Sequence, residues 1–138
     1  MKALMSHAPG APDSLVLEDV APPQPAEGEI VIRVAACGVN FPDVLMVAGE
    51  YQFKPDLPFI PGMEAAGDVI EVGSDVHGVS VGERVIVKLR NGAFAERVAV
   101  TPEHLAPLPS NFDGTTATVR LPSSREAAGT GMPEETAA

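Results

Sequence analysis

The stretch that decides the fold is residues 29–49, EIVIRVAACGVNFPDVLMVAG. Its first part is rich in β-branched side chains, with Arg33 as the only interior charge, and this composition predicts a strand. At Gly38 the pattern changes. A short helix is expected near residues 42–48, because a proline suits the first turn of a helix and Gly49 can end it. The sequence therefore predicts one long strand that leads directly into one short helix.

Apolar runs on both sides of this stretch predict further short strands. The chain has 14 prolines and 13 glycines among 138 residues, and they lie between the apolar runs, as in proteins built from many short strands. The Asn91-Gly92 pair predicts a hairpin between two of these strands. The expected strands are 2–6, 15–20, 29–37, 62–73, 83–89, 93–100 and, at a sheet edge, 104–109. This count indicates a mainly β fold, a small barrel or sandwich with one short helix.

Composition excludes several classes of protein. A length of 138 residues fits one domain, and a net charge of −10 without a lysine or arginine cluster argues against nucleic-acid binding. No stretch approaches the roughly 20 apolar residues that cross a bilayer, and the first residues, MKALMSHAPG, do not form a secretory signal. The single cysteine, Cys37, cannot form an internal disulfide. We therefore expect a cytoplasmic protein with no membrane or nucleic-acid partner.

Three motifs carry more information than composition. They are AACGVNFPD at 35–43, PGMEAAGDV at 61–69 and VGERV at 81–85. In this order and spacing they resemble the N-terminal, GroES-like domain of the medium-chain dehydrogenase/reductase superfamily, in particular its zinc-independent quinone oxidoreductase (zeta-crystallin-like) branch. The resemblance covers residues 1–109 and implies a partly open β-barrel with one or two short helices. Residues 110–138 are expected to be a linker remnant and a disordered tail.

The branch is inferred from the residues at the positions of metal ligands. In zinc-dependent alcohol dehydrogenases of this superfamily, a cysteine and a histidine occupy the positions that Asn40 and Met63 occupy here. An amide oxygen and a thioether are poor ligands for zinc, and Cys37 lies three residues before the ligand position. The resemblance therefore implies chemistry without zinc.

The resemblance also implies an activity: hydride transfer from NADPH to an electron-poor carbon of a quinone or enone. Asn40 is the expected amide donor to the substrate oxygen, and Tyr51 matches a family position that lines the nicotinamide and substrate pocket. These two residues are the expected catalytic residues, and they are also the expected contacts on the nicotinamide side of the cofactor.

Each candidate also has a structural interpretation. Asn40 could equally cap the helix, and Tyr51 taken alone would be an ordinary aromatic between surface and core. Asp43 suits the positive end of a helix, and Glu64 a structural hydrogen bond. Cys37 is expected to be a buried, inert thiol. The three histidines are expected at the surface in separate loops: His7, His77 and His104.

Family members carry a Rossmann domain after this part, and here 29 residues follow Pro109 without a complete glycine fingerprint. We therefore expect a chain truncated before that domain, which alone neither binds NADPH nor reduces quinones. Its interdomain face, with Asn40, Tyr51 and the apolar residues near Phe53 and Phe59, is expected to be exposed and to favour self-association. Two alternatives are a non-catalytic GroES-like binding or assembly module and, less favoured, a fragment of a zinc-dependent alcohol dehydrogenase.

Overall fold

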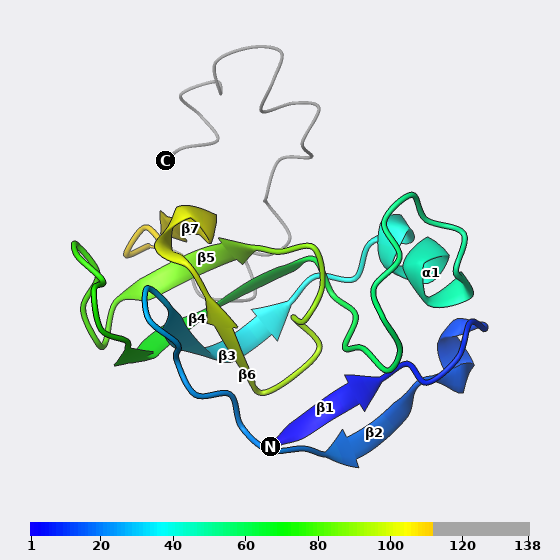
Figure 1. Ribbon diagram of the computed structural model, residues 1–138. Helices are drawn as coiled ribbons and strands as arrows, with labels where there is room; N and C mark the ends of the chain where they lie inside the picture. The colour runs from blue at the N-terminus through cyan, green and yellow to red at the C-terminus, as the bar shows by residue number, and fades with distance from the viewer. Residues whose placement is uncertain (112–138) are drawn as a thin grey trace.

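The computed structural model describes residues 1–111 of the chain. Two antiparallel sheets and one α-helix make up this part (Figure 1). The strands are β1 (Lys2–Met5), β2 (Val16–Asp19), β3 (Ile30–Cys37), β4 (Glu64–Val72), β5 (Arg84–Lys88), β6 (Arg97–Val100) and β7 (Leu105–Pro107), and the helix is α1 (Phe41–Ala48). Two 3₁₀ turns, Pro12–Ser14 and Pro102–His104, precede β2 and β7.

The larger sheet has the strand order β6-β3-β4-β5-β7, and β1 pairs with β2 in a separate two-stranded sheet. Sequence analysis correctly predicted the mainly β fold of a partly open, GroES-like barrel, as well as the helix between β3 and β4. It also placed the last described strand, β7, at an edge, where its proline removes no hydrogen bond from the sheet interior. The expected tail lies outside the described residues, apart from Ser110 and Asn111.

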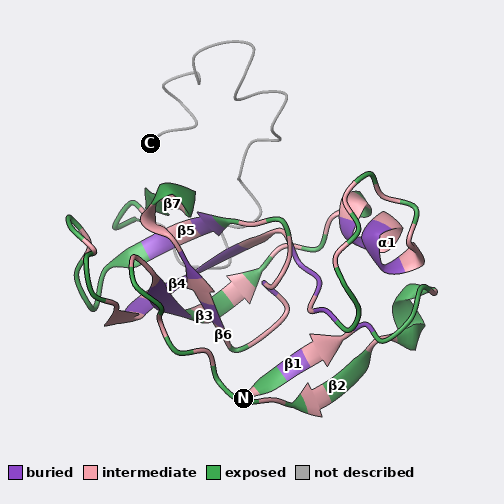
Figure 2. Ribbon diagram, viewed as in Figure 1, coloured by how far each residue is buried: buried purple, intermediate pink, exposed green. Residues whose placement is uncertain are grey.

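The main apolar cluster lies on one face of the larger sheet, and side chains of four strands contribute to it, because alternate side chains of a strand point to the same face. Figure 2 shows the buried stretches of the strands in purple. The buried members of this cluster are Ile30, Ile32, Val69, Val85, Val87, Val98 and Val100. This apolar cluster fixes β3 and β4 side by side, and the candidate site lies beyond the C-terminal end of β3.

Close packing between β3 and β4 depends on Gly67. A Cβ atom at this position would overlap the carbonyl oxygen of Arg33 on the neighbouring strand. The pairing of the two strands is irregular here, with a register shift between Val34 and Ala36. A residue without a side chain lets the two backbones approach where the register changes.

The segment after β5 does not form the predicted hairpin. Strand β5 pairs with β4 and β7, and β6 pairs with β3 on the other side of the sheet. The backbone N–H groups of Gly92 and Phe94 instead donate to the Pro61 carbonyl oxygen, at 3.3 and 3.0 Å. The chain then runs along β1, where the Leu4 N–H donates to the Phe94 carbonyl. These contacts also shorten the expected strand 93–100 to β6.

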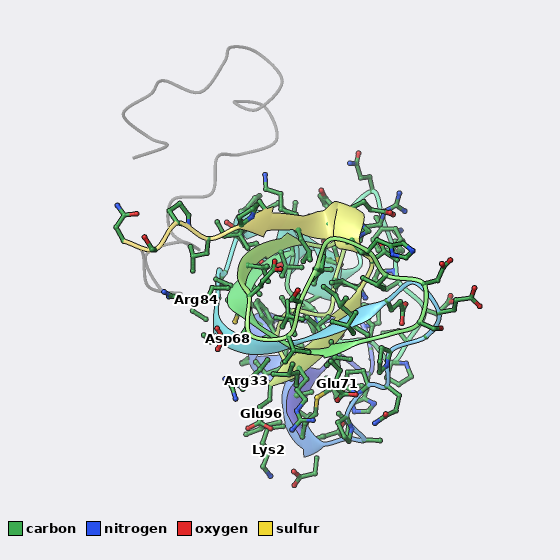
Figure 3. All side chains as sticks on the ribbon, turned by 90° about the vertical axis from the view of Figure 1, so that its left-hand side faces the viewer. Lys2, Arg33, Asp68, Glu71, Arg84 and Glu96 are labelled. Carbon is green, nitrogen blue, oxygen red and sulfur yellow. The ribbon has the colours of Figure 1, made fainter. Side chains whose placement is uncertain are left out.

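Charged side chains cross the outer face of both sheets (Figure 3). Arg84 on β5 and Arg33 on β3 stand opposite Asp68 on β4, and the Arg33 guanidinium lies 3.1 Å from the Asp68 carboxylate. Glu96, just before β6, accepts a hydrogen bond of 2.7 Å from the Lys2 backbone N–H. The Lys2 ammonium in turn pairs with Asp19 on β2. We call Arg84, Asp68, Arg33, Glu96, Lys2 and Asp19 the charge ladder.

The helix is short. Gly49 ends α1 with a left-handed backbone conformation, φ 75°, and its N–H donates to the Met46 carbonyl at 3.1 Å. Met46 and Val47 are the apolar side chains that α1 buries. Within residues 1–111, no helix has the length and apolar character that crossing a membrane requires.

Candidate functional site

Asn40 lies at the N-terminus of α1, immediately after β3. Its backbone is extended, and together with Asp43 it forms a capping box. The Asn40 N–H donates to Oδ2 of Asp43 at 2.8 Å, and the Asp43 N–H donates to the backbone carbonyl oxygen of Asn40 at 3.0 Å. The capping interpretation of Asn40 is therefore correct, and its side chain remains partly exposed at the helix start.

Asp43 is buried, with 2 % of its surface exposed. Burial raises the pKa of its carboxyl group, the backbone N–H of Asn40 acts to lower it, and the nearby charge of Glu64 raises it further; a smaller lowering comes from the backbone of Gly62. Oδ1 of Asp43 accepts no hydrogen bond from any described residue. Sequence analysis expected an ordinary helix-start charge here, and the structure shows a buried carboxyl group instead.

Glu64 connects this helix start to β4. Its side chain lies against Gly38, so closely that a Cβ atom at Gly38 would overlap the Glu64 carboxylate. The Gly38 N–H donates to the Glu64 backbone carbonyl at 3.2 Å. The Glu64 backbone thus joins the end of β3 to the start of β4, and its half-buried carboxylate faces the turn between β3 and α1.

Tyr51 lies in a hollow of about 430 Å³ that opens at the protein surface. The other residues that line it are Gln52, Phe53, Met63 and Arg90. The guanidinium of Arg90 stacks over the Phe53 ring, with its carbon 5.1 Å from the ring centroid. The structure thus brings Tyr51 together with Met63, one of the two positions that sequence analysis compared with metal ligands.

Gly62 positions Met63 at the edge of this hollow. Its φ of 103° is a conformation that favours glycine, and a Cβ atom here would lie 2.6 Å from the Phe94 ring and 2.8 Å from the Phe94 nitrogen. The Met63 carbonyl oxygen accepts a hydrogen bond of 2.8 Å from the Leu89 N–H. The residues before β4 are therefore packed against Phe94 and hydrogen-bonded to Leu89.

Asn40 does not line the hollow. Asp43 lies between Asn40 and the hollow, because the pKa of its carboxyl group is affected by Gly62 and Glu64, the two neighbours of Met63. The two expected site residues thus lie on adjacent segments. Of the other residues expected at an exposed face, Phe53 is half-buried. Phe59 is buried, with 7 % exposed, because its backbone pairs with Ser6 beside β1.

Cys37 is exposed, so the expectation of a buried thiol is wrong. It is the last residue of β3, and residues 33, 35 and 37 all point away from the core. The thiol borders an apolar hollow of about 320 Å³ between β1 and the end of β3. Partial desolvation and, to a lesser degree, the charge of Asp43 raise the pKa of this thiol.

The three histidines lie at the surface, as expected: His7 and His77 are in loops and His104 is in a 3₁₀ turn. His7 contacts Glu18, His77 lies near Asp75, and His104 bonds to Thr101. Among the described residues, no three histidine, cysteine or acidic side chains gather in a group that could hold a metal ion.

Arg90 is the residue that sequence analysis missed. The sequence pattern places it in the turn of the predicted hairpin, where its side chain would have no defined environment. The available signal was the positive charge directly after a buried strand, close to the PGMEAAGDV motif in a chain with nine lysines and arginines against nineteen acidic residues.

Residues 26–110 match the model of the alcohol dehydrogenase GroES-like domain. The chain belongs to this family. The match confirms the resemblance that the three motifs carry, and it includes Asn40, Tyr51, Met63 and Arg90.

Similar proteins include quinone oxidoreductases. The chain is 39 % identical over 118 residues to the quinone oxidoreductase-like protein 2 homolog of Nematostella vectensis, covering 84 % of this chain and 32 % of that protein. The chain thus spans about a third of the length of that relative.

Solved structures show the same fold. A human synaptic vesicle membrane protein VAT-1 homolog-like protein matches with a TM-score of 0.84 and 33 % identity, over 89 % of this chain and 40 % of that one. The quinone oxidoreductase from Thermus thermophilus, solved also in complex with NADPH, matches with a TM-score of 0.75 and 40 % identity, over 90 % and 37 %. The GroES-like domain of this chain is thus similar in fold both to a VAT-1 homolog-like protein and to a quinone oxidoreductase.

Proposed function

We propose that the chain supplies the substrate side of an NADPH-dependent quinone or enone reductase that works without zinc. The observation that carries this proposal is the hollow shared by Tyr51 and Met63. A thioether there offers an apolar wall to a planar ring, and it is a poor ligand for zinc. The volume of about 430 Å³ is within the range of roughly 300–1,000 Å³ that is typical of small-molecule sites.

The nicotinamide side of the cofactor fits this surface, and its phosphates do not. Tyr51 and Asn40 offer a phenol and an amide to a flat, polar ring. For the pyrophosphate, a parallel strand-helix-strand unit with a glycine-rich turn is the usual site, whereas α1 joins strands β3 and β4, which are antiparallel. We infer that residues outside 1–111 hold most of the cofactor.

The bound NADPH would supply the hydride, and the residues of this chain would prepare the acceptor. When the acceptor carbon of a quinone or enone gains a hydride, an electron pair moves onto the substrate oxygen. The Asn40 side chain is partly exposed at the helix start, and its NH₂ group would donate a hydrogen bond to that oxygen. Tyr51 would hold the ring against Met63, and its hydroxyl offers a second donor.

The test has two stages. The purified chain is titrated with NADPH and assayed with 1,4-benzoquinone, and we expect neither saturable binding nor turnover. The cofactor domain of the Thermus thermophilus quinone oxidoreductase is then fused after Pro109, which should restore NADPH-dependent reduction.

In the fusion, Asn40→Ala should lower kcat by about tenfold to a hundredfold with little effect on NADPH binding. Gln24→Ala is the matched control, since it removes an exposed amide from a loop outside the site. A folded fusion that binds NADPH yet reduces no quinone or enone would contradict the proposal, and would favour a non-catalytic binding module.

A further inference from the structure

Arg90 stands out among the residues of the Tyr51 hollow. It follows β5 by two residues, its side chain is exposed, and its guanidinium is held over the Phe53 ring at 5.1 Å. Stacking fixes one face of the guanidinium plane and leaves the N–H groups at its edge available. The orientation of this cation is therefore set before any ligand binds.

Arg90 forms no ion pair with any residue that the structure describes. None of the other residues that line the hollow is an aspartate or a glutamate: they are Tyr51, Gln52, Phe53 and Met63. An unpaired arginine beside an aromatic and thioether wall is suited to a planar ligand with an anionic group.

We propose that Arg90 makes this hollow selective for ring substrates that carry a carboxylate. The ring would pack against Met63 and Tyr51, while the carboxylate accepts two parallel hydrogen bonds from the guanidinium edge. This inference rests on the proposed function, because it names the class of quinone or enone that the same site prefers. It assigns Arg90 as a specificity-determining residue, outside the reacting atoms.

Binding is measured without cofactor or turnover. The probes are 4-hydroxybenzoate and its neutral isostere 4-hydroxybenzamide, which share the ring and differ in the charged group. Affinities come from isothermal titration calorimetry. Tyr51 is the only tyrosine of the chain, so ¹³C-labelled tyrosine gives a single side-chain signal that reports binding at the hollow.

We expect the carboxylate to bind the native chain about three- to fivefold more tightly than the amide, as befits one solvent-exposed ion pair. Arg90→Gln should bring this ratio to about one. Arg90→Lys should retain part of it, because the charge remains and the planar fork is lost. Arg97→Gln on β6 is the matched control: it changes the net charge equally, does not line the hollow and should keep the preference.

Three results would overturn the inference. They are equal affinity of the two probes for the native chain, a preference that survives Arg90→Gln, and carboxylate binding that leaves the Tyr51 signal unmoved. Circular dichroism of each variant confirms that it is folded.

Failure of the proposed function would look different. If the fusion with a cofactor domain reduces no quinone while the carboxylate preference holds in the chain, the reductase proposal fails and the anion site stands. If the fusion reduces neutral quinones but Arg90→Gln leaves the kcat/KM ratio of carboxylated to neutral substrates unchanged, the selectivity inference fails alone.

Discussion

Asp43 interacts both with the start of α1 and with the segment that contains Met63. Its carboxylate accepts from the Asn40 N–H, while its pKa responds to Gly62 and Glu64 on the other segment. Burial of this carboxyl group is unfavourable for its charged form, because the carboxylate loses its contact with water. Asp43 thus holds the backbone of Asn40 at the start of the helix.

The raised pKa of Asp43 gives a pH dependence with a definite sign. Since the folded state favours the protonated form, this group contributes stability that is full below the unfolded pKa of 3.8 and is lost as the pH rises through the folded value. Asp43→Asn removes this titration and keeps an acceptor for the Asn40 N–H. We expect the unfolding free energy of the native chain, relative to Asp43→Asn, to rise as the pH falls from 7 to 4.

Urea denaturation of both proteins at several pH values measures this difference. Glu64→Gln, which removes the neighbouring charge, should make the pH dependence of the difference smaller. A difference that falls with decreasing pH would show that the backbone N–H groups stabilise the charged form more than burial opposes it.

Cys37 should react with iodoacetamide in the folded chain, but more slowly than glutathione at pH 8. Its side chain is exposed, and its raised pKa lowers the thiolate fraction. Asp43→Asn should speed the reaction, since the charge of Asp43 contributes to the shift. Mass spectrometry of the intact chain over time follows the modification, and a thiol that reacts only in urea would contradict the exposed position.

The exposure of Cys37 follows from the alternation of side chains along its strand. Arg33 is on an outward position of the strand, and Cys37 is four residues further, on the same face. Small neighbours suggested burial, although the period of the strand indicated the opposite. The burial of Asp43 could not have been predicted in this way, because it depends on the distant residues Gly62 and Glu64.

The elements themselves were predicted well where the signal was local. β3, α1 and β4 follow from β-branched runs, a proline in the first turn and flanking glycines, and their observed bounds differ from the predicted ones by one or two residues. The predicted hairpin is absent, because the Asn91-Gly92 pair indicates only a turn and does not determine which strands pair. The backbone of residues 92–96 bonds to Pro61, Gly62, β1 and Val34 of β3, which lie far away in the sequence.

Gly67→Ala should destabilise the fold strongly, by about 3 kcal/mol or more. The new Cβ would overlap the Arg33 carbonyl oxygen, so the backbones of β3 and β4 would have to separate in the middle of the sheet. Gly78→Ala is the matched control. It has no atom within 4 Å of the added Cβ, and its φ of 78° should cost about 1–2 kcal/mol.

Urea denaturation of the three proteins measures these costs. Equal losses for the two variants would mean that β3 and β4 relax around the added methyl group.

At the scale of the whole molecule, two features act in opposite directions on self-association. Exposed apolar side chains near the helix start favour it, and the high net charge opposes it. Val39 and Phe41 are 75 % and 72 % exposed, while the chain carries a net charge of −10. We expect reversible self-association that increases with salt, because salt screens the mutual repulsion of the chains.

Sedimentation velocity at 0.05 and 1 M NaCl tests this expectation. Val39→Ser combined with Phe41→Ser should reduce the association, and Val81→Ser, which removes a residue 63 % exposed in another loop, should not. A native chain that stays monomeric at high salt and high concentration would contradict it.

The charge ladder helps to determine the register in which β4 pairs with its neighbouring strands. Sliding β4 by two residues along its neighbours would leave every side chain on its original face, so the alternation of apolar and polar residues discriminates weakly against that mispaired state. The slide would, however, take Asp68 away from Arg33 and Arg84 at the same time, since both stand opposite this one carboxylate. Pairs that contribute about 1 kcal/mol or less each to the native state can therefore act together against a wrong alignment of the central strand.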